Sequence, residues 1–160
     1  MALGQTPEEY LKSLQHPAGW FELVQTIVEM VAENAQGDNN LAFLEEVGRR
    51  VAASYPLNTV KKLSELNVAF NNHLYKFNWG YVDIEDAGDS LIFRHHCMPL
   101  TGKPDTDAVW QRSFCAVLLG LYNVWLHQSG SPKTLHCDLV RLTSNDGAVF
   151  RLKRRNPNKA

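Results

Sequence analysis

The pattern of apolar and polar residues is most regular between Leu57 and Phe77, and we place the rest of the chain relative to this stretch. Apolar side chains recur every three or four positions, as one face of a helix requires, at Val60, Leu63, Phe70, Leu74 and Phe77. Gly80 then ends the helical pattern, and residues 81–84 alternate as in a strand. The sequence therefore predicts a long helix over 57–77, followed by a rigid structural corner at Asn78, Trp79, Gly80 and Tyr81.

Three further helical patterns precede this stretch. The first begins at the N-cap Thr6, continues through Pro7-Glu8-Glu9 and ends at His16-Pro17. It has little apolar surface to bury, so residues 1–19 are predicted to form an N-terminal arm that is either mobile or a docking element. The other two patterns cover residues 20–36 and 41–54. Gly48 lies on the apolar face of the third pattern, where we expect another backbone to approach closely.

Four strand patterns and one more helix follow the corner. Residues 81–85 and 90–98 flank the turn sequence Asp86-Ala87-Gly88-Asp89, and residues 135–142 and 148–152 flank a second turn at 144–147. A helix from residue 106 or 107 to about residue 128 separates these hairpins. The predicted fold class is α+β, with about five helices packed with a small four-stranded antiparallel sheet of two hairpins. We expect one domain over 20–152 and a basic C-terminal tail over 153–160.

The helix between the hairpins is apolar on two faces from Phe114 to Leu126. A helix of this kind lies at the centre of a core or is shared with another subunit. We expect one face to pack in the core and the other to form a homo-oligomer interface. The predicted interface residues are Cys115, Leu119, Tyr122, Trp125 and Leu126.

Composition limits the class of protein. The chain has 160 residues, 44% of them hydrophobic and 21% charged, with a formal net charge of −1. A chain of this length forms one domain that buries roughly two-thirds of its unfolded surface. The balance of charge gives no indication of nucleic-acid binding, and the basic run from Arg151 to Lys159 is explained more simply as a solvated tail than as a polyanion or partner site.

The expected location is the cytoplasm, with the periplasm as the second possibility. The first ten residues lack the charged and apolar regions of a secretory signal, and the longest uncharged apolar run, 113–126, is too short to span a bilayer. The three cysteines, Cys97, Cys115 and Cys137, are odd in number and sit in apolar segments, which fits reduced thiols in a core.

The sequence contains two candidate metal-binding clusters, His95-His96-Cys97 and His136-Cys137. Zinc requires three or four ligands that converge on one point, whereas neighbouring residues of a strand face opposite sides of the sheet. The pattern places Cys97 and Cys137 on core rows and His96 and His136 on the opposite face. At most two ligands then meet on either side, so we predict no metal site.

The sequence gives equally little support for thiol catalysis, phosphate or calcium binding, or the stacking of sugars on aromatic rings. The cysteines could lie near a histidine, yet no strained glycine turn accompanies any of them. The glycines are scattered singly and form no phosphate-binding loop, and the acidic residues 83–89 match no EF-hand and suit a solvated hairpin. The tryptophans could stack on sugar rings if exposed, but most are expected in the core. We predict no catalytic residue and no cofactor.

Three segments, read in order, give the chain a resemblance to a known family. They are Leu44-Glu45-Glu46-Val47-Gly48-Arg49-Arg50, Asn78-Trp79-Gly80-Tyr81-Val82, and Phe114–Leu126 with its Leu119-Gly120-Leu121-Tyr122 and Trp125. Between the first two lies a long helix with Leu63, Leu66 and Asn67. At these separations the segments resemble the cellulose synthase operon protein D family, an accessory subunit of bacterial cellulose secretion systems. The resemblance covers about residues 20–152.

The resemblance implies a non-enzymatic protein that forms an octamer from four dimers. Members of the family are expected to organise cellulose synthase complexes or to guide emerging glucan chains, and so to promote crystalline cellulose. The implied partners are further copies of the chain, subunits of the synthase complex, glucan chains and a proline-rich cytoplasmic protein.

Two alternatives remain open at the level of sequence. One is a small-ligand or lipid-binding α+β module, which predicts an enclosed apolar pocket beneath the 57–77 helix. The other is a thiol or metal enzyme that uses Cys97 or Cys137.

Overall fold

The computed structural model describes residues 6–34, 39–143 and 146–154. The helices are α1 (Pro7–Gln15), α2 (Trp20–Asn34), α3 (Asn39–Ser54), α4 (Leu63–Phe77) and α5 (Pro104–Gln128). The strands are β1 (Tyr81–Asp86), β2 (Leu91–His96), β3 (Leu135–Thr143) and β4 (Gly147–Arg154). These elements confirm the predicted α+β fold. The end of the second predicted helix, part of the second turn and most of the arm's first residues and of the basic tail lie outside the described residues.

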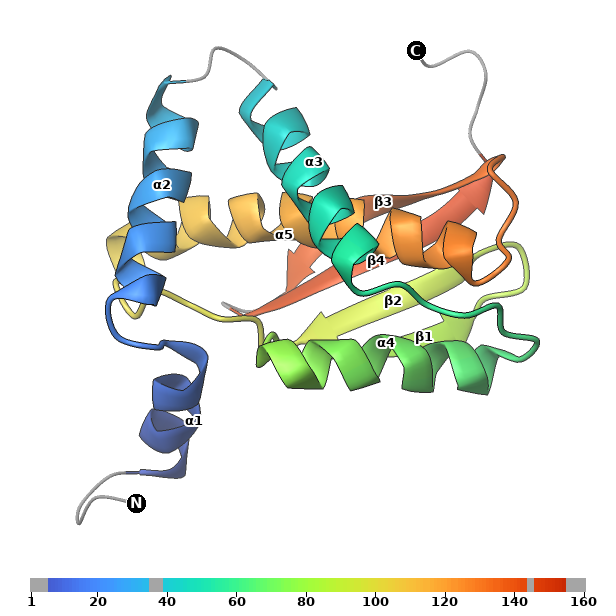
Figure 1. Ribbon diagram of the computed structural model, residues 1–160, viewed down its shortest axis with the longest axis horizontal. Helices are drawn as coiled ribbons and strands as arrows, with labels where there is room; N and C mark the ends of the chain where they lie inside the picture. The colour runs from blue at the N-terminus through green and yellow to red at the C-terminus, as the bar shows by residue number, and fades with distance from the viewer. Residues whose placement is uncertain (1–5, 35–38, 144–145, 155–160) are drawn as a thin grey trace.

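All four strands belong to one antiparallel sheet in the order β1-β2-β4-β3. The two predicted hairpins form its halves, and pairing between β2 and β4 joins them, with Phe93 opposite Phe150. Helix α5 lies between this sheet and α3, whereas α4 lies along β1 (Figure 1). Helix α2 stands at one end of the molecule, and α1 projects from the body beside it.

The backbones of α3 and α5 approach each other closely where the two helices cross. A Cβ atom on Gly48 of α3 would lie 1.9 Å from the carbonyl oxygen of Val117, and one on Gly120 of α5 would lie 1.9 Å from that of Glu45. The two glycines are thus reciprocal, and each admits the backbone of the other helix. The close approach predicted at Gly48 is confirmed, and its partner is Gly120.

On the side away from α3, helix α5 packs against the sheet. A cluster of aromatic rings at this contact forms the centre of the core. Phe70 of α4 lies 5.2 Å from both Tyr122 and Trp125 of α5, measured between ring centroids. Tyr122 also contacts Phe150 at 5.3 Å and Phe93 at 5.8 Å. Helix α5 therefore has two apolar faces because α3 covers one and the sheet with α4 covers the other.

The helix predicted over 57–77 is wrong in its first part, because α4 begins at Leu63. The N–H of Leu57 donates to Gln128 Oε1 at 2.9 Å, and the N–H of Val60 donates to the carbonyl of Ser129 at 3.1 Å. The segment before α4 thus binds the C-terminal end of α5. The carboxylate of Glu65 accepts hydrogen bonds from the N–H groups of Lys61 and Lys62 and so caps the start of α4.

The strand predicted over 90–98 also ends early, at His96. Cys97 adopts a left-handed backbone with φ of 57°, which breaks the alternation of faces. Its side chain is exposed, so the prediction that Cys97 belongs to the core is wrong. Cys137 is buried as predicted. At the other end of the sheet β4 continues to Arg154, so residues 153 and 154 of the predicted tail are strand.

We predict that Gly48→Ala and Gly120→Ala each destabilise the fold by about 3 kcal/mol or more, because the added methyl meets a carbonyl that belongs to a packed helix. The measurement is denaturant-induced unfolding followed by circular dichroism. Gly88→Ala serves as the control, since a Cβ there meets nothing within 4 Å and costs only left-handed backbone strain, about 1 kcal/mol. Equal stability losses at all three positions would contradict the crossing.

Candidate functional site

The turn between α4 and β1 is the predicted corner, and its backbone is tightly constrained. Asn78 ends α4 with φ of 56°, and the N–H of Trp79 donates to the carbonyl of Leu74 at 3.1 Å. Gly80 has φ of 86°, and a Cβ atom there would lie 2.0 Å from the carbonyl oxygen of His96. Only glycine fits between the corner and the end of β2, which supports the architectural role predicted for these residues.

A buried hydrogen-bond chain joins the corner to α5. His95 Nε2 lies 2.7 Å from the carbonyl oxygen of Trp79, and His95 Nδ1 lies 2.6 Å from the hydroxyl of Tyr122. Because the carbonyl only accepts, Nε2 carries the proton and Nδ1 accepts from Tyr122. Burial lowers the pKa of His95 to about 4 and raises that of Tyr122 well above its ordinary value, so both groups are neutral.

Two asparagines of α4 hold the first strand of the sheet. Asn71 donates from Nδ2 to the carbonyl of Val82 and accepts from the N–H of Val82, both at 2.8 Å. Asn67 Oδ1 accepts from the N–H of Ile84 at 3.2 Å. These amides complete hydrogen bonds that an edge strand otherwise leaves to solvent or to another chain. The signal that could have identified them is the spacing of Asn67 and Asn71, which lie four residues apart and so on the same side of the helix.

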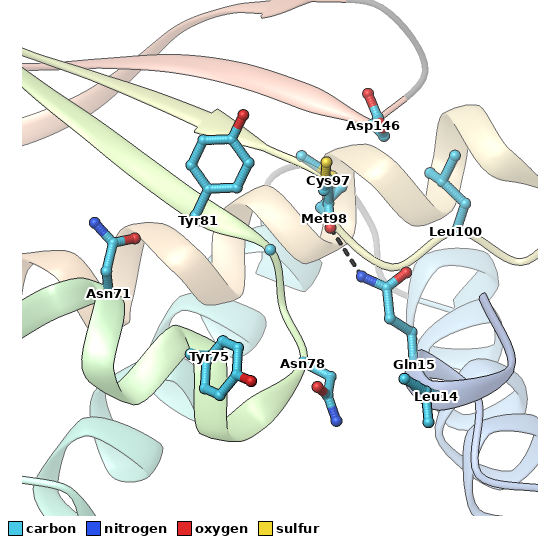
Figure 2. Close-up of a pocket in the computed structure, with 11 residues that line it drawn as sticks. Leu14, Gln15, Asn71, Tyr75, Asn78, Tyr81, Cys97, Met98, Leu100 and Asp146 are labelled. Atoms are coloured by element: carbon cyan, nitrogen blue, oxygen red, sulfur yellow. Dashed lines mark hydrogen bonds between the residues drawn. The ribbon is translucent and has the colours of Figure 1, made fainter. Parts of the chain in front are cut away.

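A pocket of about 420 Å³ lies beside the corner, and we call it the corner pocket (Figure 2). Its lining comes from α1, from the end of α4 and from residues 80–81, 97–98, 100 and 146. Two tyrosine rings stand at this pocket: Tyr75 is 81% exposed, and exposed Tyr81 stacks on His96 with 4.9 Å between ring centroids. Gln15 closes one side by donating from Nε2 to the carbonyl of Cys97 at 3.0 Å.

A second pocket of about 420 Å³, the apolar cleft, opens between α2 on one side and α3 and α5 on the other. Its walls are almost entirely apolar, and the polar side chains in its lining are Gln15, Asn78 and Ser113. The space beneath α4 is instead filled by Phe70 and Leu74, which are fully buried. The apolar cleft therefore does not lie beneath that helix, where the small-ligand alternative predicts its pocket.

The residues weighed for metal or thiol chemistry are dispersed. Within ranges 6–34, 39–143 and 146–154, no group of three His, Cys, Asp or Glu side chains converges as metal ligands do. His96 Nε2 lies 3.4 Å from Asp83, and His136 Nε2 lies 3.5 Å from Asp138. Each of these histidines lies beside a single carboxylate, and both pairs lie on the outer face of the sheet.

The cysteines show no feature of an activated nucleophile. Burial raises the pKa of the Cys115 thiol to about 12 and that of Cys137 further. The pKa of Cys97 is also raised, first by partial burial and then by Asp146. All three thiols are therefore protonated near neutral pH, and a protonated thiol is a poor nucleophile.

The structure places the five predicted interface residues inside one chain. Cys115, Tyr122, Trp125 and Leu126 are at most 2% exposed, and Trp125 Nε1 donates to the carbonyl of Tyr55 at 2.9 Å. Leu119 is half-buried and packs at the edge of the core. A second copy can reach only Leu119 without displacing other elements, so the interface at this helix stays a prediction that depends on that residue.

A large apolar surface that sequence reasoning missed lies on α2 and the start of α3. Only Gln25 of the fifteen residues of α2 is buried, although the helix is mostly apolar. The exposed large side chains, which we call the α2 surface, are Trp20, Leu23, Val24, Ile27, Met30 and Phe43. Along α2 these side chains recur every three or four residues, so they form one exposed apolar stripe on the helix.

None of the helices in the described parts of the chain combines the length and the apolar character needed to cross a bilayer.

Comparisons with known proteins identify the fold and the family. A family model for the D subunit of cellulose synthase matches residues 6–153, which extends the expected 20–152 through α1. None of the curated proteins compared with the chain matches it. Among solved structures, a trafficking protein particle complex subunit 3 from Naegleria fowleri, covalently bound to palmitic acid, is similar with a TM-score of 0.50. The two chains share 10% identity over 93% of this chain and 97% of the other, which is a likeness of fold alone.

We predict that the chain loses stability as the pH falls from about 6.5 to about 4, with a contribution from His95 of about 3 kcal/mol. The unfolded chain protonates this imidazole below about 6.5, whereas the folded chain keeps it neutral down to about 4. Unfolding therefore takes up a proton in this range and becomes easier.

The measurement is the free energy of unfolding at several pH values for the wild type and for His95→Gln. The variant should be less stable at neutral pH but should show a shallower dependence between these limits. His96→Gln, on the opposite face of β2, is the matched control. A dependence that is unchanged in His95→Gln would show that His95 does not carry this effect.

Proposed function

The chain belongs to the family of cellulose synthase D subunits, and we propose that within cellulose synthesis it is a non-catalytic accessory subunit that acts by assembly. In this proposal several copies form a homo-oligomer that holds synthase complexes in register, so that neighbouring glucan chains crystallise together. The effect comes from multivalency, and the chain performs no chemical step.

The observation that carries this proposal is the α2 surface. Trp20 is 71% exposed, and further large apolar residues continue from it along α2 to Phe43. Monomeric proteins rarely expose contiguous apolar patches of this kind unless another molecule covers them. A helix presented in this way suits a two-fold contact, in which the same patch of two copies meets itself.

The finer features follow the family resemblance. We propose four dimers in an octamer, with synthase subunits and a proline-rich protein as partners. We also propose an arm over 1–19 and one domain from residue 20 to the end of β4 at Arg154, with the basic tail after it. The cytoplasm is the proposed location, ahead of the periplasm. The free thiols of Cys115 and Cys137 support it, because buried reduced cysteines are common where thiols stay reduced.

The corner pocket supports a second role, direct contact with glucan. Tyr75 and Tyr81 present aromatic rings at the pocket, and the side-chain amides of Gln15 and Asn78 also line it. Rings of this kind pack against the apolar faces of sugars, and amides donate to and accept from hydroxyl groups.

The apolar cleft supports a different class of function, the binding of a lipid or another small apolar ligand. Its volume falls within the range of known ligand sites, and its lining has few polar groups. The two classes differ in what purifies with the chain: a bound ligand of defined mass favours this alternative, whereas assembly predicts a multiple of the chain mass alone.

We predict that the wild-type chain is an oligomer at micromolar concentration and that Ile27→Glu reduces it to smaller species, because a buried unpaired carboxylate disfavours the interface. Native mass spectrometry measures both the assembly and any retained ligand. Val68→Glu on α4 is the matched control, since Val68 is 58% exposed and Ile27 51%. A monomeric wild type would contradict the proposed assembly.

We predict that the chain binds a soluble cello-oligosaccharide and that Tyr75→Ala weakens binding about tenfold, the effect of losing one well-packed aromatic contact. Isothermal titration calorimetry provides the measurement, and Val68→Ala, also exposed on α4, provides the control. Identical affinities in wild type and Tyr75→Ala would remove the glucan role of this pocket.

A further inference from the structure

Helices α2 and α3 both contact α5, and the apolar cleft lies among the three helices (Figure 1). Its floor belongs to the packed part of the fold, because Trp110, Phe114 and Val117 of α5 are at most 7% exposed. Its rim includes Val24 and Ile27 of the α2 surface, which remain exposed. Part of α2 therefore faces the core across a hollow that is apolar on both sides.

A row of aromatic rings lines this hollow. The ring of Trp110 lies 5.3 Å from Phe21 on one side and 5.8 Å from Phe114 on the other, measured between ring centroids. Trp79 continues the row at 5.1 Å from Phe114. An apolar molecule that displaces water from these rings gains the free energy of burying them. The volume of about 420 Å³ suits a small molecule.

The lining of the cleft also excludes charge. None of the described residues that form it carries an ionisable side chain. A carboxylate or phosphate bound against the floor would be buried without a cation, which is costly. An extended peptide would bury N–H and C=O groups that the apolar walls leave unpaired. The cleft therefore favours an uncharged and mostly apolar small molecule.

One polar side chain belongs to the buried floor. Ser113 of α5 lines the cleft and is 3% exposed, and its hydroxyl makes no hydrogen bond to another residue in the described part of the chain. The other polar side chains differ, because Gln15 donates to the carbonyl of Cys97 and Asn78 is exposed. A hydroxyl both donates and accepts, so that of Ser113 can pair with an alcohol or a carbonyl group of a ligand.

We propose that the apolar cleft binds an uncharged apolar molecule that carries one hydroxyl or carbonyl group, with that group hydrogen-bonded to Ser113. Such an occupant contacts α2 and the floor together, so it joins α2 to α5. The inference narrows the small-ligand class that the cleft supports to neutral molecules. It goes beyond the proposed assembly and does not depend on it, since Leu23 and Met30 of the α2 surface do not line the cleft.

The experiment titrates the full-length chain at neutral pH with 1-decanol and with decanoate, which has the same chain length but a carboxylate in place of the alcohol. Isothermal titration calorimetry measures both affinities. We expect 1-decanol to bind at least about tenfold more tightly, because the carboxylate finds no cation in the cleft. Amide hydrogen exchange in the presence of 1-decanol should slow in α2 and stay unchanged in α4.

Ser113→Ala should weaken the binding of 1-decanol about fivefold, which is the effect of one lost hydrogen bond. Ser131→Ala is the matched control. The hydroxyl of Ser131 is also buried and has no hydrogen-bond partner among the described residues, but it lines a different pocket, beyond the C-terminal end of α5. The control variant should bind 1-decanol as tightly as the wild type.

The outcomes separate the ligand site from the proposed assembly, because native mass spectrometry reports the oligomeric state of each sample. An oligomeric chain that does not bind 1-decanol overturns the ligand site and leaves the assembly intact. Equal affinities for 1-decanol and decanoate overturn the preference for a neutral ligand, and an unchanged affinity in Ser113→Ala overturns the contact with Ser113. A monomeric chain that binds 1-decanol with the expected preferences supports the site and contradicts the assembly.

Discussion

The contact between the backbones of α3 and α5 is the constraint on which the rest of the structure depends. At Gly48 and Gly120 each helix lies against a carbonyl of the other, so neither position tolerates a side chain. This close approach holds α5 in the space between α3 and the sheet. The aromatic rings of Phe70, Tyr122 and Trp125 can then meet at a single point in the core.

From that core, polar contacts fix the corner that carries the chain from α4 into the sheet. The neutral imidazole of His95 links the corner carbonyl to Tyr122, and Gly80 lets the turn lie on the end of β2. The buried histidine His95, the hydroxyl of Tyr122 and the thiols of Cys115 and Cys137 take part in the packing and hydrogen bonding of the core. The features open to other molecules lie at the periphery, in α1, α2 and the two pockets.

Much of the fold could be predicted from the sequence because its signals are local. Period-two alternation around glycine-containing turns located both hairpins, and an isolated glycine in an apolar stripe located the helix crossing at Gly48. The predictions fail where contacts with residues distant in the sequence determine the local structure. Leu57 and Val60 donate their N–H groups to the end of α5, and Cys97 leaves the strand through a left-handed backbone. The apolar periodicity continues through both stretches, so it indicates neither the late start of α4 nor the early end of β2.

The surfaces were harder to predict than the core for a related reason. Apolar periodicity identifies which side chains avoid water but not what covers them, so Tyr122 and Trp125 were assigned to an interface although the sheet and α4 bury them. The apolar residues of α2 show the opposite case, because no element in the described part of the chain buries their side chains although they are as apolar as core residues.

The central claim is that this chain contributes to cellulose synthesis by assembly. The most direct test measures the crystallinity of cellulose, by X-ray diffraction, from cells whose only copy carries Ile27→Glu or the control Val68→Glu. The account predicts that Ile27→Glu lowers crystallinity to the level of cells lacking the chain, while Val68→Glu leaves it unchanged. Wild-type crystallinity from cells in which the Ile27→Glu protein is folded and monomeric would contradict it.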